Sequence, residues 1–326
     1  MAALDPAVAA VRTSVRTALT GLPENALVLV ACSGGADSMA LAGATAFVAP
    51  RLGLRAGLVT VDHRLQDGSA DRAATVAAWA RDAGFAPAMS VPVDATPDAQ
   101  GPEAAARRAR YAALAGVARA ESARAVLTGH TRDDQAETVL LALARGGGPR
   151  GLAGMRARRD LEGGTLLRPL LSVSRSQTRA ACAAEGVAVW DDPHNTEDRF
   201  ARVRVREAMD TLIAALGADV VPNLARTAEL VAADTDALDA MAVSARDGVE
   251  VDGRLECARL AELPSALRTR VLRAFALDAG APGGALAAIH IAALDALVVR
   301  WRGQGPAALP GGHRVARIDG WLELLV

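Results

Sequence analysis

A short polar stretch, SGGADS, lies between an apolar run and an alanine-rich run. Glycines let backbone N–H groups approach an anion, and the start of a helix favours negative charge, so this pattern is typical of a phosphate site. Asp37 is unusual there, because a carboxylate beside a polyphosphate is repulsive unless Mg²⁺ lies between them. We expect Asp37 to be a catalytic metal ligand. The residues expected to bind nucleotide phosphates are Ser33, Gly34, Gly35, Ala36, Asp37 and Ser38.

The chain contains no lysine, since all 36 of its Lys and Arg residues are arginine. This excludes the G-x-x-x-x-G-K-[ST] nucleotide loop and a lysine Schiff base. Its three cysteines, Cys32, Cys182 and Cys257, include no C-x-x-C pair. That argues against a disulfide framework, a zinc ribbon and a cysteine-bound iron–sulfur cluster. The open question is which phosphate chemistry uses such a loop without a lysine.

A second polar stretch, TGHTRDDQAET, covers residues 128–138. Asp134 and Glu137 lie three apart and Asp133 and Glu137 four apart, so a helix beginning here presents carboxylates on one face. Near a polyphosphate they would hold Mg²⁺, and near a cationic substrate they would hold ammonium groups. The alternative is helix capping by Asp133, because early acids complement the helix dipole. We expect Asp134 to be a catalytic metal ligand, and Asp133 and Glu137 to bind substrate.

Arginines at helical spacing supply positive charge. Arg107 and Arg110 share one helix face, from which they would contact nucleotide phosphates or a charged intermediate. Arg202 and Arg206 lie four apart, with Arg204 between them, and would reach leaving phosphates or a nucleic-acid backbone. We expect Arg107 and Arg202 to be catalytic and Arg110 to bind the nucleotide. Arg204 and Arg206 are expected to bind substrate.

Apolar runs that alternate with amphipathic helices predict an α/β fold with a Rossmann-like parallel sheet and helices on both faces. Strands are expected at 27–31, 54–63, 86–94 and 124–130, and a further short strand within 166–171. Ligands bind at the carboxyl ends of such strands. The polar residues of 33–38, 62–63 and 130–137 collect there. We expect a first domain at 1–215, a linker helix at 216–245 and a smaller, mostly helical α+β domain at 246–326.

Charge is unevenly distributed. Residues 145–206 carry 12 arginines and seven acids, whereas residues 207–326 carry 11 arginines and 16 acids. The stretches RGGGPRGLAGMRARR and RFARVRVR contain no acids, so they form either a solvated face or a surface for an anionic polymer. Only nine residues are aromatic. Binding to nucleic acid would therefore rest mainly on arginine–phosphate contacts, with base stacking a minor resource.

The sequence offers no membrane span, because no apolar run reaches roughly 18 residues. Asp5 and Pro6 also interrupt the N-terminus where a secretion signal would be basic and then apolar. We expect a cytoplasmic protein without membrane association. Nothing in the sequence predicts its oligomeric state.

The hexapeptide at 33–38 matches the S-G-G-x-D-S pyrophosphate loop of the N-type ATP pyrophosphatases. The resemblance implies cleavage of ATP between the α and β phosphates, adenylation of a carbonyl oxygen and displacement of AMP by a nucleophile. Over about 200 residues the chain further resembles the tRNA(Ile)-lysidine synthetase family. The segments that carry this second resemblance are VDHRL, EAAARRARY, HTRDDQAET, RGGGPRGLAGM, RPLL and DDPHNTEDRFARVRVR.

The second resemblance implies ATP and Mg²⁺ as cofactors, and tRNA(Ile) with a CAU anticodon and free L-lysine as partners. C2 of the wobble cytidine would be adenylated, and lysine would displace AMP to give lysidine. The resemblance places adenosine at Asp62 and His63 and adds His130 to the nucleotide site. It makes 1–215 the catalytic domain and 246–326 the tRNA-binding domain. The chain departs from the family pattern at Arg64 and Gln66, and at Val203, where the family has asparagine.

Three alternatives remain. A tRNA 2-thiolation enzyme of the same superfamily would need a cysteine pair or cluster ligands near the loop. A synthetase that adenylates a small molecule would not need the basic middle segment. A non-catalytic nucleotide-binding module would not need Asp37, Asp134 and the paired arginines.

Overall fold

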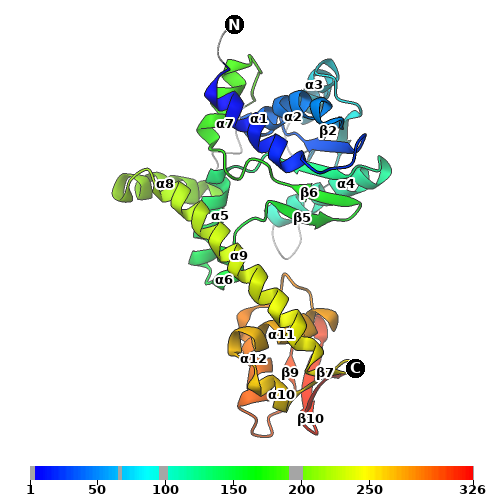
Figure 1. The fold of residues 1–326 in the computed structure, drawn as a ribbon, viewed down its shortest axis with the longest axis vertical. Helices are drawn as coiled ribbons and strands as arrows, with labels where there is room; N and C mark the ends of the chain where they lie inside the picture. The colour runs from blue at the N-terminus through cyan, green and yellow to red at the C-terminus, as the bar shows by residue number, and fades with distance from the viewer. Residues whose placement is uncertain (1–3, 65–67, 95–101, 191–200, 326) are drawn as a thin grey trace. The chain divides into compact units, whose positions relative to one another are not determined.

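The computed structural model of the protein describes residues 4–64, 68–94, 102–190 and 201–325, with the backbone alone at 102–104 and 201–202. The chain divides into two compact units, Met1–Ala232 and Ala233–Val326. The division falls within the long helix α9 (Val220–Asp247). Each unit has its own sheet (Figure 1). Each also has its own hydrophobic core.

A six-stranded sheet in the order β3-β2-β1-β4-β6-β5 forms the centre of the first unit. Neighbouring strands are parallel except β5 and β6, which form an antiparallel hairpin. The predicted parallel α/β sheet is therefore confirmed. The sequence pattern does not predict β5, because RRDL is a polar edge strand without apolar alternation. The strands are β1 (Leu27–Ala31), β2 (Arg55–Asp62), β3 (Ala88–Pro92), β4 (Ala125–Thr128), β5 (Arg158–Leu161) and β6 (Gly164–Leu167).

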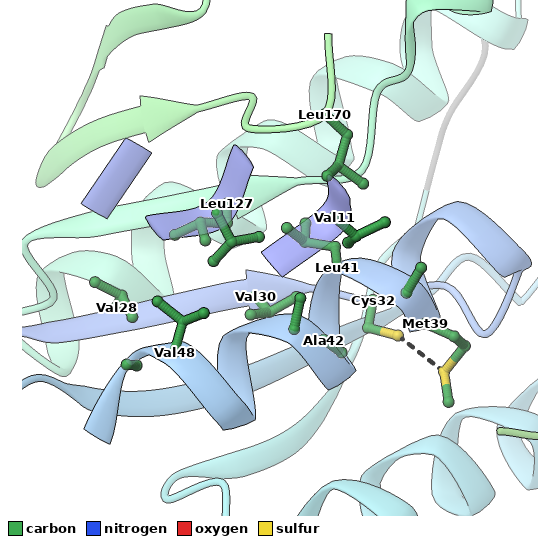
Figure 2. Close-up of a cluster of buried hydrophobic side chains, with 14 of the residues drawn as sticks. Val11, Val28, Val30, Cys32, Met39, Leu41, Ala42, Val48, Leu127 and Leu170 are labelled. Atoms are coloured by element: carbon green, nitrogen blue, oxygen red, sulfur yellow. Dashed lines mark hydrogen bonds between the residues drawn. The ribbon is translucent and has the colours of Figure 1, made fainter. Parts of the chain in front are cut away.

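Both faces of the sheet are covered. Val28 and Val30 of β1 join a core with helices α1 (Pro6–Leu19), α2 (Ala36–Val48) and α7 (Arg175–Ala184), part of which is drawn in Figure 2. Leu27 and Leu29 point to the other face and pack with Leu114 of α4 (Pro102–Ala120). Because successive strand residues face opposite sides, burial on both faces requires the unbroken apolar run LVLVA.

The order of the strands places a switch point at the carboxyl ends of β1 and β4. β1 lies between β2 and β4, so the chain leaves β1 in one direction and later returns on its other side. Such a switch point opens a crevice at the carboxyl ends of the strands. Ala31 of β1 pairs in register with Thr128 of β4. The loop 33–38 and the start of α5 (Arg132–Ala144) therefore begin side by side.

Further helices complete the first unit. They are α3 (Ser69–Asp82), α6 (Gly148–Leu152) and α8 (Ala201–Leu216), with the short 3₁₀ helix η1 (Pro50–Leu52). Ala136 of α5, Met209 of α8 and Val221 of α9 form a small buried cluster. Within the described ranges no single helix is long and apolar enough to cross a membrane, and α8 and α9 pass that test only as a bent pair.

The second unit is an α+β structure, as predicted. Its antiparallel sheet has the order β7-β8-β11-β10-β9. Leu255, Leu272, Leu294 and Leu322 lie in the core between this sheet and the helices. The strands are β7 (Glu250–Val251), β8 (Arg254–Glu256), β9 (Ala307–Ala308), β10 (Arg314–Ile318) and β11 (Trp321–Leu325). The helices are α10 (Cys257–Glu262), α11 (Ser265–Asp278), α12 (Ala288–Val299) and the 3₁₀ helix η3 (Pro310–Gly312).

Gly129 lets the end of β4 approach the first turn of α2. A Cβ atom at this position would lie 2.9 Å from the carbonyl oxygen of Asp37 and 3.0 Å from the nitrogen of Ser38. Both neighbours are backbone atoms, which cannot move aside as a flexible side chain can. A side chain at 129 would therefore push apart the two elements that carry the predicted site.

We predict that Gly129→Ala lowers the free energy of unfolding by about 1–3 kcal/mol, as overpacking does. The matched control is Gly116→Ala within α4, where no atom lies within 4 Å of the added Cβ. Alanine at 116 should stabilise the helix by about 0.5–1 kcal/mol. Urea unfolding of both variants measures these changes in the free energy of unfolding. Equal effects at positions 129 and 116 would contradict the close approach of the end of β4 to α2.

Candidate active site

The loop after β1 presents backbone donors. Gly34 has a φ of +87°, and a Cβ there would lie 3.2 Å from Cγ2 of Val76, so the position requires glycine. Gly35 precedes α2, and no side chain of the described residues caps this helix. The first N–H groups of α2 are thus available to an anion. Trp190 fixes the loop by donating its backbone N–H to the Gly34 carbonyl at 3.0 Å.

The two serines of the loop differ in their surroundings. Ser38 is only 8% exposed. Its hydroxyl donates to the Gly35 carbonyl at 2.9 Å and accepts from the Ser33 N–H at 3.1 Å, which holds the loop together. Ser33 is exposed. Its hydroxyl is therefore the accessible one.

The predicted acids meet at a residue that the sequence analysis did not single out, Arg175. Its Nη2 lies 3.0 Å from Oδ1 of Asp134 and 3.1 Å from Oε1 of Glu137. Its Nε lies 3.8 Å from Oδ2 of Asp37, and its backbone N–H donates to Oδ2 of Asp133 at 2.8 Å. One arginine thus joins acids from two separate sequence motifs.

The sequence holds only a partial signal for Arg175. Ser174 and Gln177 form a capping box, which marks Arg175 as the first residue of a helix. The local pattern does not say which loop this helix faces. That depends on how α7 packs beside α2, where the Thr178 hydroxyl donates a hydrogen bond to Oδ1 of Asp37.

Asp133 does not cap its own helix, α5, which was the alternative to a role in substrate binding. Thr131 is the N-cap, and Asp134 completes the capping box by accepting from the Thr131 N–H at 2.8 Å. The carboxylate of Asp133 instead accepts the first N–H of α7. Asp134 therefore uses Oδ2 to hold the start of its own helix and Oδ1 to contact Arg175.

The charges of the cluster are strongly coupled. Burial raises the pKa of Asp37 to about 6; the Thr178 hydroxyl opposes this rise, and the charge of Asp134 adds to it. Burial also acts to raise the pKa of Asp134, but Arg175 and the Thr131 N–H lower it more, so it lies below its ordinary value. Burial acts to lower the pKa of Arg175, and the acids outweigh that effect. Two neighbouring carboxyl groups thus have pKa values pushed in opposite directions, as is common at functional sites.

Glu137 is the most buried acid of the cluster, at 3% exposure. Its Oε1 accepts from Arg175 and from Nε of Arg206, each at 3.1 Å. Its Oε2 is buried and has no hydrogen-bond partner among the described residues. A cavity of about 70 Å³ adjoins it, with apolar side chains of α8 on one side. The charged residues lining this cavity are Asp133, Glu137, Arg175, Arg206 and Asp210.

A second group of predicted residues meets at the end of β2. Asp62 accepts the Arg64 N–H at 2.9 Å, a bond that lowers the pKa of Asp62. Arg110 donates to Nε2 of His63 at 3.1 Å. Burial and the charge of Arg110 lower the pKa of His63 to about 4. His63 is therefore neutral at pH 7 with its proton on Nδ1, an atom that is buried and lacks a partner in the described part of the chain.

The remaining predicted residues make further contacts, and the charge of His130 acts to lower the pKa of Asp134. Arg107 packs over Tyr111, with its guanidinium carbon 5.0 Å from the ring centroid. Nδ1 of His130 lies 3.0 Å from the Thr128 hydroxyl at the end of β4. Arg204 is exposed on α8. The side chain of Arg202 lies outside the described residues.

Within the described ranges, no group of three or more His, Cys, Asp or Glu residues is arranged to hold a metal ion. Asp37 and Asp134 supply carboxylates on either side of Arg175. A metal bound to these two would need further oxygen atoms from a ligand. Mg²⁺ is commonly held in this way, by one or two carboxylates and substrate phosphates.

Comparison with known proteins shows the family of the chain. Residues 9–212 match a model described as a PP-loop domain, and residues 255–322 match one described as a TilS substrate binding domain. A protein of Salinispora tropica named tRNA(Ile)-lysidine synthase is 63% identical over 100% of this chain and 98% of its own length. The chain belongs to the tRNA(Ile)-lysidine synthase family. The family resemblance predicted from the motifs is thereby confirmed.

A second relative supports the same family, and a solved structure supports the fold. A tRNA(Ile)-lysidine synthase of Thermobifida fusca is 57% identical, with 98% of both chains covered. Among solved structures, a U34-tRNA thiolase of Methanococcus maripaludis with its [4Fe-4S] cluster has a TM-score of 0.57. It is 17% identical over 69% of this chain and 80% of its own, so the likeness concerns the fold alone.

We predict opposite effects of pH at the two coupled carboxyl groups. The pKa of Asp37 is higher in the folded protein than its ordinary 3.8, so ionisation of Asp37 costs stability above about pH 6 and none below about pH 4. Asp37→Asn should therefore raise the free energy of unfolding at pH 8 by about 2–3 kcal/mol. The difference from wild type should vanish near pH 4.

Asp134→Asn is the matched comparison, because the pKa of Asp134 is lowered in the folded protein. Ionised Asp134 contributes stability that is lost as the pH falls, so this variant should be less stable than wild type at pH 8. Urea unfolding from pH 4 to pH 8 measures both. The same sign of change for both variants at pH 8 would contradict the assignment.

Proposed function

We propose that the protein is an ATP-dependent ligase that adenylates C2 of the wobble cytidine in the CAU anticodon of tRNA(Ile) and joins free L-lysine to it. The proposal rests on family membership over the whole chain. At the site, its main support is the contact of Asp37, in the pyrophosphate loop, with the arginine that also binds Asp134 and Glu137. A phosphate site thereby adjoins a site for a cationic amino acid.

The reaction needs two displacements. The O2 atom of cytidine attacks the α-phosphate of ATP, the bond to the β-phosphate breaks, and pyrophosphate leaves. An amino group of lysine then attacks C2, and AMP leaves with the O2 atom. The loop at Gly34, Gly35 and Ala36 would hold the pyrophosphate through its N–H groups.

Asp37 and Asp134 fit Mg²⁺, because a cation beside Asp37 would offset the unfavourable burial of its charge. When bound, the ion would neutralise charge on the phosphates as pyrophosphate departs. The adenosine end is proposed to lie at Asp62 and His63. The Nδ1–H of His63, which has no partner among the described residues, would donate to an acceptor of the nucleoside.

The cavity at Glu137 is proposed to receive lysine. The Oε2 of Glu137, without a hydrogen bond in the described part of the chain, would accept from an ammonium group, with Asp133 and Asp210 adding negative charge. Arg206 would face the carboxylate of the amino acid, and apolar side chains of α8 would contact its methylene groups. This arrangement suits a substrate with charges of both signs.

The cysteines disfavour the 2-thiolation alternative. Cys32, Cys182 and Cys257 are all free and buried. Burial raises the pKa of Cys182 to about 11 and that of Cys32 above its ordinary value. Both are therefore neutral thiols at pH 7, whereas sulfur transfer and cluster binding need thiolates. We also infer a cytoplasmic location from the tRNA substrate.

The reaction itself is the first test. Purified protein, Mg-ATP, labelled lysine and tRNA(Ile) with a CAU anticodon should release AMP and place label in the tRNA. Elongator tRNA(Met), which shares the anticodon, should remain unlabelled. AMP release without RNA, or no incorporation of lysine, would refute the proposal.

We expect Glu137→Gln to raise the KM for lysine by about 10- to 100-fold, because a charged hydrogen bond to the ammonium is lost. Pyrophosphate release should be much less affected. Glu207→Gln on the exposed surface of α8 is the control and should change neither quantity. An unchanged KM for lysine in Glu137→Gln would remove this residue from the lysine site.

A further inference from the structure

The arginines of the second unit fall into two groups. Five of the six outside residues 296–318 are ion-paired: Arg246, Arg254, Arg259, Arg268 and Arg270. Residues 296–318 hold four more and contain no aspartate or glutamate. These four are Arg300, Arg302, Arg314 and Arg317, and none forms an ion pair with a described acid. A positive stretch thus lies within a unit that has 12 acids and ten arginines.

Trp301 lies in this stretch and is 39% exposed. The guanidinium carbon of Arg317 lies 5.5 Å from the centroid of its ring. Arg317 is itself fixed, because its Nη1 donates to the carbonyls of Leu297 and Val298 at the end of α12, each at 3.1 Å. The indole of Trp301 is therefore positioned by the anchored Arg317 while part of the ring stays exposed.

The turn that carries Trp301 is also fixed. The Gln304 side chain accepts the Arg302 N–H at 2.6 Å and donates to the Ala296 carbonyl at 3.1 Å. Arg300 and Arg302, the sequence neighbours of Trp301, are both exposed. An indole stacks on any nucleic-acid base, and guanidinium groups bind the adjoining phosphates.

Trp321, a second tryptophan in the same unit, has different surroundings from Trp301. Trp321 lies 5.0 Å from the guanidinium carbon of Arg254, but Arg254 is ion-paired with Glu323 at 3.2 Å. Trp321 is also half-buried. The charge of that pair is neutralised within the protein, whereas the arginines around Trp301 form no ion pair with an acid of the described residues.

We propose that Trp301, with Arg300, Arg302 and Arg317, forms a stacking platform for an unpaired nucleotide of the tRNA. This inference rests on the proposed function, which supplies tRNA as the partner. The match of residues 255–322 to a substrate binding domain supports docking on this unit. An unpaired nucleotide is the part of an RNA that offers a free base face.

The test uses the full-length protein and a tRNA(Ile) transcript with a CAU anticodon. Trp301→Ala should weaken filter-measured binding about tenfold, and Trp301→Phe should stay within about threefold of wild type, because the ring still stacks. The KM for tRNA should rise while kcat at saturating tRNA stays unchanged. Leu324→Ala, at a position 38% exposed, is the matched control and should bind as wild type does.

Charge is tested separately. Arg302→Gln should reduce the slope of log binding constant against log salt concentration by about one, since one phosphate contact is lost. Arg259→Gln, an exposed arginine paired with Glu256, should leave the slope unchanged. Wild-type binding of tRNA by the Trp301→Ala variant would overturn this inference alone. Failure of the wild-type protein to bind or modify tRNA would instead overturn the proposed function.

Discussion

Three partly buried carboxylates lie close together in the site, those of Asp37, Asp134 and Glu137. Carboxylates in such surroundings repel one another unless a cation lies among them. Arg175 is that cation in this structure, and it joins the starts of α2, α5 and α7. The compensation is incomplete, because the pKa of Asp37 is still about 6. The site therefore holds its acids in place while retaining a preference for further positive charge. A metal ion or an ammonium group would meet that preference.

The sequence predicts the frame of this site well. A buried strand, a glycine loop and acids at helical spacing are local patterns, so β1, the loop 33–38 and the acidic face of α5 follow from them. Arg175 does not follow, because its partners depend on how α7 packs against α2. The same holds for the pairing of His63 with Arg110, which lie 47 residues apart. Side chains that bind a helix other than their own, as Asp133 of α5 binds the start of α7, are equally beyond local patterns.

The second unit shows what amino-acid composition alone cannot predict. With nine aromatic residues in the chain, composition predicts little stacking on bases. Composition averages over the chain, however, and cannot tell which aromatic side chain remains exposed. The acid-free stretch 296–318 is readable in the sequence, but the exposure of Trp301 and the anchoring of Arg317 appear only in the structure. Local charge together with exposure is therefore more informative than either alone.

In the proposed reaction the O2 atom of the wobble cytidine bonds to the α-phosphate before lysine attacks C2. Isotopic labelling follows this oxygen atom. A tRNA(Ile) with ¹⁸O at C2 of this cytidine is converted with Mg-ATP and lysine, and the products are analysed by mass spectrometry. Adenylation at C2 predicts that the ¹⁸O appears in AMP and is absent from the modified nucleoside. Unlabelled AMP, with the ¹⁸O retained in the RNA or released into water, would contradict it.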